Sequence, residues 1–171
     1  AAVSWLLQHT APLVKVTIVP RGNSLGAAWY LPEERQITTK EQILDEICAA
    51  LGGRAAEEVT FGAVSTGALS DLEKITKQAY ATVAVFGLNK EIGNISYYDS
   101  SGNADYSFTK PYSEKTAEKI DEEVKKMVEE AYVRTVSLLR NNKEKLDTLA
   151  GTLLEKEVIF KEDLEAIFGK R

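Results

Sequence analysis

The spacing of the apolar residues changes at about residue 38 from that of a strand to that of a helix, and this change limits the folds available to the chain. Before that point, Val14, Val16 and Ile18 recur at every second position, which is the period of a half-buried β-strand. After it, apolar residues recur every three or four positions, the spacing of an α-helix with one buried face. Turn residues follow the first strand, so we expect one β-hairpin over residues 14–31. The chain is therefore predicted to be a mainly α-helical α+β domain.

The expected helices have identifiable ends. At the start of the first, either Thr38 with Glu41 or Thr39 with Gln42 fits a capping box, which bonds free backbone N–H groups of the first turn. The pair Gly52-Gly53 is expected to interrupt this helix, because glycine is unfavourable within helices. The other expected helices cover residues 1–9, 54–60 and 71–86, a long stretch from Ser113, and a C-terminal helical region that ends with residues 162–168.

Length and charge exclude several kinds of protein. A chain of 171 residues fits one domain, and at this size folding removes about 70% of the accessible surface. No apolar run approaches the roughly 20 residues that span a bilayer, so this piece is expected to be soluble and without direct membrane contact. The net charge of -5 and the isoelectric point near 5.1 argue against a nucleic-acid partner, which would need clustered and uncompensated Lys and Arg.

Two segments are set apart by their composition. Residues 98–106 are rich in Ser, Gly, Asn and Asp and poor in large apolar side chains, so we expect a mobile loop there. Residues 1–7 begin within an apolar helical pattern, with neither an initiator Met nor a capping residue. The chain is therefore expected to be an excerpt of a longer protein.

Asp71 is the residue whose position most suggests a metal ligand. It follows the small-residue turn of residues 65–70 and stands at the start of the helix expected over residues 71–86. A carboxylate at a helix N-terminus is stabilised as the anion by the helix dipole and the free N–H groups, and zinc binds the anion. The same position also fits an ordinary helix cap, and spacing alone favours that alternative.

A zinc site needs more ligands than Asp71. A catalytic zinc takes three protein ligands, commonly two His four residues apart on one helix face and one distant carboxylate. His9 is the only His of the chain and is interpreted as a polar residue at a helix end. Glu57 and Glu58 point in different directions on a helix, so at most one of them can face a metal, and both also fit a solvated surface.

The expected hairpin carries two neighbouring aromatic residues. Trp29 and Tyr30 in its second strand fit a peptide-binding edge, where an extended substrate adds a strand through main-chain hydrogen bonds. Aromatic residues of a hairpin also fit a position in the core. Neither glycine-rich phosphate-binding motif, G-x-x-x-x-G-K-[ST] or G-x-G-x-x-G, occurs in the chain, so nucleotide binding in those ways is excluded.

Several blocks of residues stand in the order and approximate spacing of one known family. The N-terminal blocks are Pro12-Leu13-Val14-Lys15-Val16-Thr17-Ile18-Val19-Pro20-Arg21-Gly22, Leu25-Gly26 and Leu31-Pro32. The central blocks are Leu51-Gly52-Gly53-Arg54-Ala55-Ala56-Glu57-Glu58, Phe61-Gly62 and Ser65-Thr66-Gly67-Ala68, followed by Asp71. Together they resemble the peptidase domain of the FtsH family of membrane-anchored, ATP-dependent zinc proteases, over nearly the whole chain.

For the whole protein, the resemblance implies a hexamer in which an AAA+ ATPase ring feeds unfolded or membrane proteins to the peptidase. ATP would act only through that separate module, and the hexamer would be a homo- or hetero-hexamer. The parent would lie in a membrane, with the peptidase domain facing the cytoplasm or an organelle matrix. This chain would be a single zincin-like helical peptidase domain over residues 1–171, with the hairpin in residues 1–112 and a C-terminal helical bundle in residues 113–171.

For the site, the resemblance implies that Asp71 is the third zinc ligand. It also implies that Glu57 or Glu58 supports the site without binding the metal. The strand that matches the substrate-holding edge of the family consists of Ala27, Ala28, Trp29 and Tyr30.

One element of the family is absent from these residues. The H-E-x-x-H helix, which carries two His ligands and the general-base Glu, would end directly before Ala1. Two explanations are open: the chain begins after the motif, or the parent is a degenerate relative that kept the fold as a non-catalytic oligomerisation domain. We favour the first, in which this piece is inactive alone and the catalytic Glu lies upstream.

Overall fold

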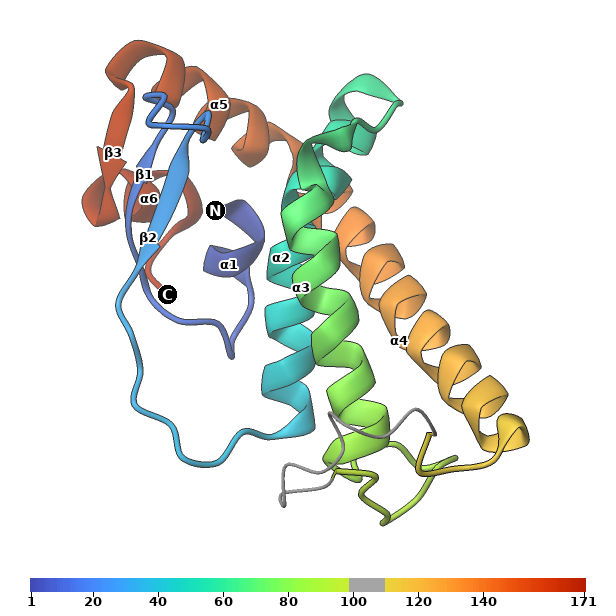
Figure 1. Cartoon of the computed structure of the whole chain (residues 1–171). Coiled ribbons are helices and arrows are strands. Elements are labelled where there is room, and N and C mark those ends of the chain that lie inside the picture. Colours follow the sequence, from blue (N-terminus) through green and yellow to red (C-terminus); the bar gives the residue numbers. More distant parts are fainter. Residues whose placement is uncertain (99–109) are drawn as a thin grey trace. The chain divides into compact units, whose positions relative to one another are not determined.

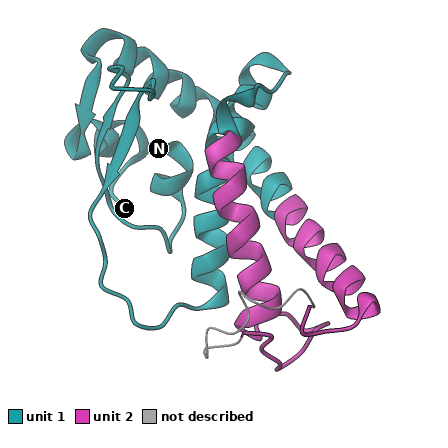
Figure 2. Ribbon diagram, in the orientation of Figure 1, with its two compact units in different colours: residues 1–68, 131–171 teal, residues 69–130 magenta. Residues whose placement is uncertain are grey.

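The computed structural model describes residues 1–98 and 110–171 (Figure 1). Its contacts divide the chain into two compact units, which have different colours in Figure 2. Unit 1 consists of residues 1–68 and 131–171, and unit 2 of residues 69–130. The long helix α4 (Glu114–Asn141) therefore contributes residues to both units.

Unit 1 contains a three-stranded antiparallel sheet in the order β2-β1-β3. β1 (Leu13–Thr17) and β2 (Ala27–Tyr30) confirm the hairpin expected within residues 14–31. β3 (Val158–Phe160) was not expected, because three residues are too few to show a strand period. β1 is the central strand, so β2 lies at an edge, and no strand of the described residues pairs with its other side.

Helix α2 (Lys40–Phe61) runs without a break through Gly52-Gly53, so the expected interruption is wrong. The capping box forms at Thr39: its Oγ1 accepts a hydrogen bond from the N–H of Gln42 (3.3 Å), and the Thr39 N–H donates to Oε1 of Gln42 (2.8 Å). The helix ends at Gly62, whose φ of 68° is left-handed and favours glycine.

Packing explains why α2 carries a glycine at position 52, but not at position 53. A Cβ atom at Gly52 would lie 3.1 Å from Cγ2 of the buried Val3 on helix α1 (Ala2–Leu6), so the absence of a side chain lets α1 pack closely against α2. A Cβ atom at Gly53 would meet nothing within 4 Å. Tertiary contacts therefore offset the helix cost of glycine, which is about 1 kcal/mol per residue.

The C-terminal helices of unit 1 pack around the sheet. Helix α6 (Lys161–Phe168) contacts β1, β3 and α1, and helix α5 (Lys143–Lys156) contacts β3 and α6. Val16 and Ile159 lie opposite each other in the sheet and are both buried, so they mark its inward face. Other buried apolar residues of unit 1 include Trp5, Leu13, Ile43, Ile47, Cys48, Leu51, Ala55, Leu139, Leu149 and Leu164.

Unit 2 is helical. Helix α3 (Leu69–Tyr80) continues into a π-helical turn, η2 (Ala81–Val85), which together confirm the helix expected over residues 71–86. The expected cap of α4 is also confirmed, since Oγ of Ser113 accepts a hydrogen bond from the N–H of Thr116 (3.2 Å). Apolar residues of unit 2 that are buried include Ile75, Ala79, Val83, Ala117, Ile120, Val124 and Met127.

The architecture confirms the mainly α-helical α+β class. None of the helices that the structure describes is long and apolar enough to cross a bilayer. The loop expected over residues 98–106 lies, apart from Tyr98, outside the described residues. The boundaries of the two units, at residues 68 and 131, differ from the division at residue 113 that the sequence suggested. A single peptidase domain over residues 1–171 stays a prediction.

Candidate functional site

Asp71 lies in the first turn of α3, where the sequence places it, and its side chain is exposed. A helix cap would accept a hydrogen bond from a backbone N–H of the first turn. Among residues 1–98 and 110–171, Asp71 makes no such bond and no ion pair. The structure therefore does not support the helix-cap alternative, and it leaves the carboxylate available to a ligand. A role in zinc binding stays a prediction.

Glu57 holds the turn that precedes the short helix η1 (Thr66–Ala68). Its carboxylate accepts hydrogen bonds from the hydroxyl of Ser65 (2.7 Å) and from the Ser65 N–H (2.9 Å). Oγ of Ser65 in turn accepts a hydrogen bond from the N–H of Gly67 (3.2 Å). These bonds hold the pKa of Glu57 below its usual value of 4.5. The bond from the Ser65 hydroxyl has the larger effect, and the bond from the Ser65 N–H comes second. Glu57 is therefore an ionised side chain that fixes the backbone of this turn.

Glu58 has a different partner. Its carboxylate accepts a hydrogen bond from the phenol of Tyr132, which lies in the part of α4 that belongs to unit 1. The two neighbouring acids thus face different groups, as the helical geometry of α2 predicts. Glu58 links α2 to α4, whereas Glu57 serves the turn after α2.

The residues present do not assemble a zinc site by themselves. Within residues 1–98 and 110–171, no group of three or more His, Cys, Asp or Glu side chains could hold a metal ion. Three protein ligands are the usual minimum for a catalytic zinc, and Asp71 supplies at most one. The chemistry of this donor set therefore fits part of a zinc site only.

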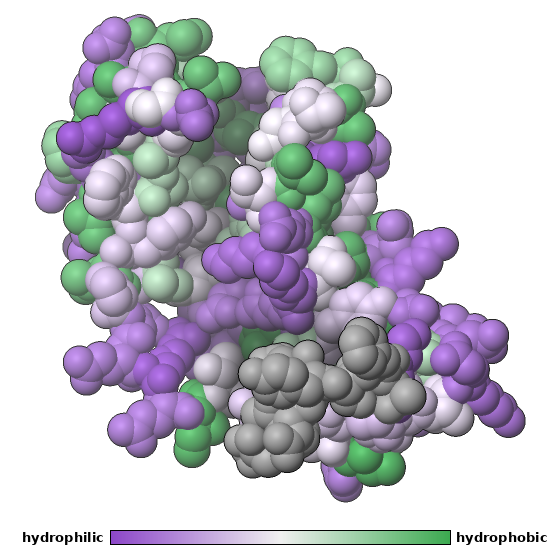
Figure 3. Space-filling model, viewed as in Figure 1, coloured by the Kyte–Doolittle hydropathy of each residue, from purple (hydrophilic) through white to green (hydrophobic). Residues whose placement is uncertain are grey.

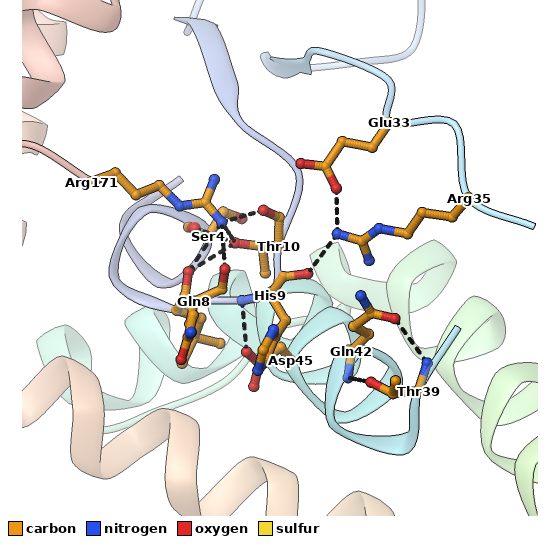
Figure 4. Close-up of polar contacts among 11 residues, drawn as sticks. Ser4, Gln8, His9, Thr10, Glu33, Arg35, Thr39, Gln42, Asp45 and Arg171 are labelled. Atoms are coloured by element: carbon orange, nitrogen blue, oxygen red, sulfur yellow. Dashed lines mark hydrogen bonds and ion pairs between the residues drawn. The ribbon is translucent and has the colours of Figure 1, made fainter. Parts of the chain in front are cut away.

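The backbone of His9 takes part in a hydrogen-bond network with Asp45 and Arg35 (Figure 4). Its backbone N–H donates to Oδ2 of Asp45 (3.0 Å), a residue that is 3% exposed. Oδ1 of the same carboxylate accepts a hydrogen bond from Nη1 of Arg134 on α4 (2.9 Å). The buried charge of Asp45 is thus paired and hydrogen-bonded, as a buried carboxylate requires. The interpretation of His9 as a polar residue near a helix end agrees with this position.

The expected substrate edge is accessible. Trp29 and Tyr30 on β2 are 51% and 41% exposed, so neither is a core residue. The hydroxyl of Tyr30 is hydrogen-bonded to Oγ of Ser4 on α1 (2.9 Å). Trp29 lies on the face of the sheet opposite to Tyr30. There, Nζ of Lys15 lies 5.6 Å from the centroid of the Trp29 ring. On the face shown in Figure 3, the atoms over this part of unit 1 are mostly of intermediate hydropathy, and strongly hydrophilic atoms lie in the region of the segment that follows β2. Among the described residues, β2 therefore offers an unpaired strand edge with side chains of mixed character.

Sequence reasoning missed the contacts that hold the two ends of unit 1 together. The guanidinium of Arg171 donates to the backbone carbonyl of Leu7 (3.1 Å) and to Oγ1 of Thr10 (2.7 Å) (Figure 4). Nε1 of Trp5 donates to the carbonyl of Gly169 (2.9 Å). These bonds join residues more than 160 positions apart, and no local pattern in the sequence could pair them.

Comparison with known proteins assigns most of the chain to one family model. The model described as peptidase family M41 matches residues 1–167. This match covers both units of the structure, including Asp71, Glu57, Glu58 and β2.

Individual relatives agree with the family model. A Parabacteroides distasonis protein named ATP-dependent zinc metalloprotease FtsH is 62% identical over 171 residues, which are 100% of this chain and 25% of that protein. A Karelsulcia muelleri protein of the same name is 55% identical over 98% of this chain and 27% of its own length. The Mus musculus mitochondrial inner membrane m-AAA protease component AFG3L2 is 48% identical over 100% of this chain and 21% of its own length. The chain thus spans about a quarter of the length of these relatives.

Proposed function

The chain belongs to peptidase family M41, and from this we propose that it is the proteolytic domain of an ATP-dependent zinc metalloendopeptidase that degrades unfolded or membrane proteins. The observation that carries the proposal is the family match over residues 1–167, joined to relatives that are named zinc metalloproteases. A match of this extent includes every residue that the sequence singled out for the site. We propose the substrates and the dependence on ATP for the longer protein, because this chain spans only about a quarter of the length of the named relatives.

In this proposal Asp71 is one of three protein ligands of the zinc ion. Its support is the exposed carboxylate in the first turn of α3, which has no partner in the described part of the chain. The other two ligands and the catalytic Glu would come from an H-E-x-x-H segment of the longer protein, since this chain has a single His. The chain would then bind no catalytic zinc alone.

Glu57 has a supporting role in the proposal. Its hydrogen bonds to Ser65 fix the turn that leads through η1 into α3, the helix that carries Asp71. A metal ligand must be held within a fraction of an ångström of its productive position, so an ordered turn before it matters for metal binding. Glu58 supports α2 through Tyr132.

The substrate would bind along β2 as an additional strand. The free edge of Ala27–Tyr30 and the exposure of Trp29 and Tyr30 support this assignment. In the longer protein we propose a homo- or hetero-hexamer that is anchored in a membrane, with the peptidase domain on the cytoplasmic or matrix side. The relative named as a mitochondrial inner membrane protease component supports the membrane setting.

Degradation of labelled casein by the longer protein tests the proposal. We expect ATP-dependent degradation by the wild-type protein and none by the Asp71→Ala variant, because a missing ligand leaves the zinc site incomplete. Glu73→Ala removes another exposed acid from α3 and His9→Ala removes the only His of this chain, and both variants should degrade casein at nearly the wild-type rate. A wild-type rate in the Asp71→Ala variant would remove this residue from the active site.

A non-catalytic oligomerisation domain is the alternative function. The observation in its favour is that the described residues form no three-ligand metal cluster. The two functions predict different results for the longer protein. An inactive relative would assemble into hexamers but bind no stoichiometric zinc and degrade no casein.

A further inference from the structure

The outward face of the sheet carries a row of three side chains beside the proposed substrate edge. Trp29 of β2 and Phe160 of β3 both lie opposite Lys15 of β1 in the strand register. The two aromatic residues are 51% and 50% exposed. We call these three residues the outward row. It faces away from the buried side of the sheet, which Val16 and Ile159 mark.

The positive charge of the outward row has no acidic partner among the residues that the structure describes. Within residues 1–98 and 110–171, Lys15 takes part in no ion pair. Its ammonium group instead extends over Trp29, 5.6 Å from the ring centroid, within the range of a cation–π contact. The side chain of Lys15 therefore reaches from the central strand toward the free edge of β2.

A polypeptide that adds to β2 brings its own side chains to this row. Successive residues of a strand point to opposite faces of a sheet, so every second substrate residue would lie on the outward face. The substrate residue opposite Trp29 would have its Cβ atom about 5 Å from the Cβ atom of Trp29. Its side chain would thus meet the indole ring and the ammonium group that lies over this ring.

We propose that the outward row is a charge-selective subsite, in which the substrate residue opposite Trp29 is favoured when it is acidic and disfavoured when it is basic. The methylene groups of a Glu would contact the indole, and its carboxylate would pair with the ammonium of Lys15. A Lys at the same position would meet a like charge. This inference rests on the proposed function, since it requires β2 to bind the substrate.

The test measures binding and cleavage of peptides by the longer protein. A set of fluorescently labelled peptides carries Glu, Gln or Lys at each successive position, and the affinity is measured by anisotropy beside kcat/KM. At one register position we expect Glu to be favoured over Gln by about two- to fivefold, the effect of an exposed ion pair. This preference should shrink at 1 M salt, where the Debye length is about 3 Å.

Variants of Lys15 show whether the outward row causes the preference for an acidic substrate residue. Lys15→Glu should reverse the preference so that Lys is favoured over Gln, and Lys15→Gln should abolish it without reversing it. The control Lys145→Glu makes the same change of net charge on α5 and should leave the preference as in the wild type. An unchanged preference for Glu in both Lys15 variants would overturn the charge-selective subsite.

The two proposals fail in different ways. If the peptides bind and are cleaved with no charge preference at any position, the subsite is wrong and the proposed function stands. If no peptide binds to the longer protein, while its fold is intact by circular dichroism, the assignment of β2 as the substrate edge fails and the subsite fails with it.

Discussion

Among single residues, Glu57 shows how one side chain can order a segment that spacing alone describes only as a turn. The sequence placed Glu57 on a helix near a Ser-Thr-Gly turn, but it could not show that both the N–H and the hydroxyl of Ser65 donate to its carboxylate. Asp71 is the opposite case: its position in the first turn of α3 was predictable, but the lack of a partner for its carboxylate within residues 1–98 and 110–171 was not. Hydrogen-bond partners depend on which rotamer the fold selects, and a linear pattern does not contain that information.

The carboxyl group of Glu57 should titrate below pH 4.5, because the hydrogen bonds from Ser65 lower its pKa. A group whose pKa is lower in the folded than in the unfolded state contributes stability above the unfolded value, and this contribution is lost as the pH falls through the folded value. Carboxyl-carbon NMR measures the titration. Ser65→Ala should raise the pKa of Glu57 toward 4.5, and the exposed Ser137→Ala should leave it unchanged. An equal pKa in wild type and Ser65→Ala would contradict the role of Ser65.

At the scale of helices and strands, elements with a sustained period were predictable, and short or packing-dependent features were not. The hairpin, the capping box at Thr39 and the cap of α4 follow from local chemistry. β3 has only three residues and forms because β1 offers it a partner more than 140 positions earlier in the chain. The break predicted at Gly52-Gly53 failed because the contact between α1 and α2 outweighs local helix propensity.

The two glycines of α2 provide a matched test of this explanation. Gly53→Ala places a methyl group in open space and should raise the free energy of unfolding by about 0.5–1 kcal/mol, the helix advantage of Ala over Gly. Gly52→Ala gains the same propensity but places its Cβ 3.1 Å from the buried Val3, so it should be less stable than Gly53→Ala. Urea unfolding measures both variants. Equal stabilisation by the two substitutions would show that α1 does not restrict position 52.

For the molecule as a whole, the sequence identifies the family, and the structure shows which parts of the proposed site these residues provide. The ordered blocks of the sequence pointed to the family, and the match over residues 1–167 shows that the chain belongs to it. The structure adds an accessible strand edge at β2. Among the residues that it describes, the carboxylate of Asp71 has no partner and no complete metal cluster is formed. We therefore propose that this chain contributes one ligand to a zinc site that residues of the longer protein complete.

Zinc content is the measurement that tests this claim most directly. The longer protein, which we propose to carry an H-E-x-x-H segment, is dialysed first against zinc and then against zinc-free buffer, and its bound metal per chain is measured. We expect about one zinc per chain in the wild type and in Glu73→Ala, and a large loss in Asp71→Ala, because two of three ligands hold zinc far more weakly. Full zinc occupancy in Asp71→Ala, or no stoichiometric zinc in the wild type, would contradict the account.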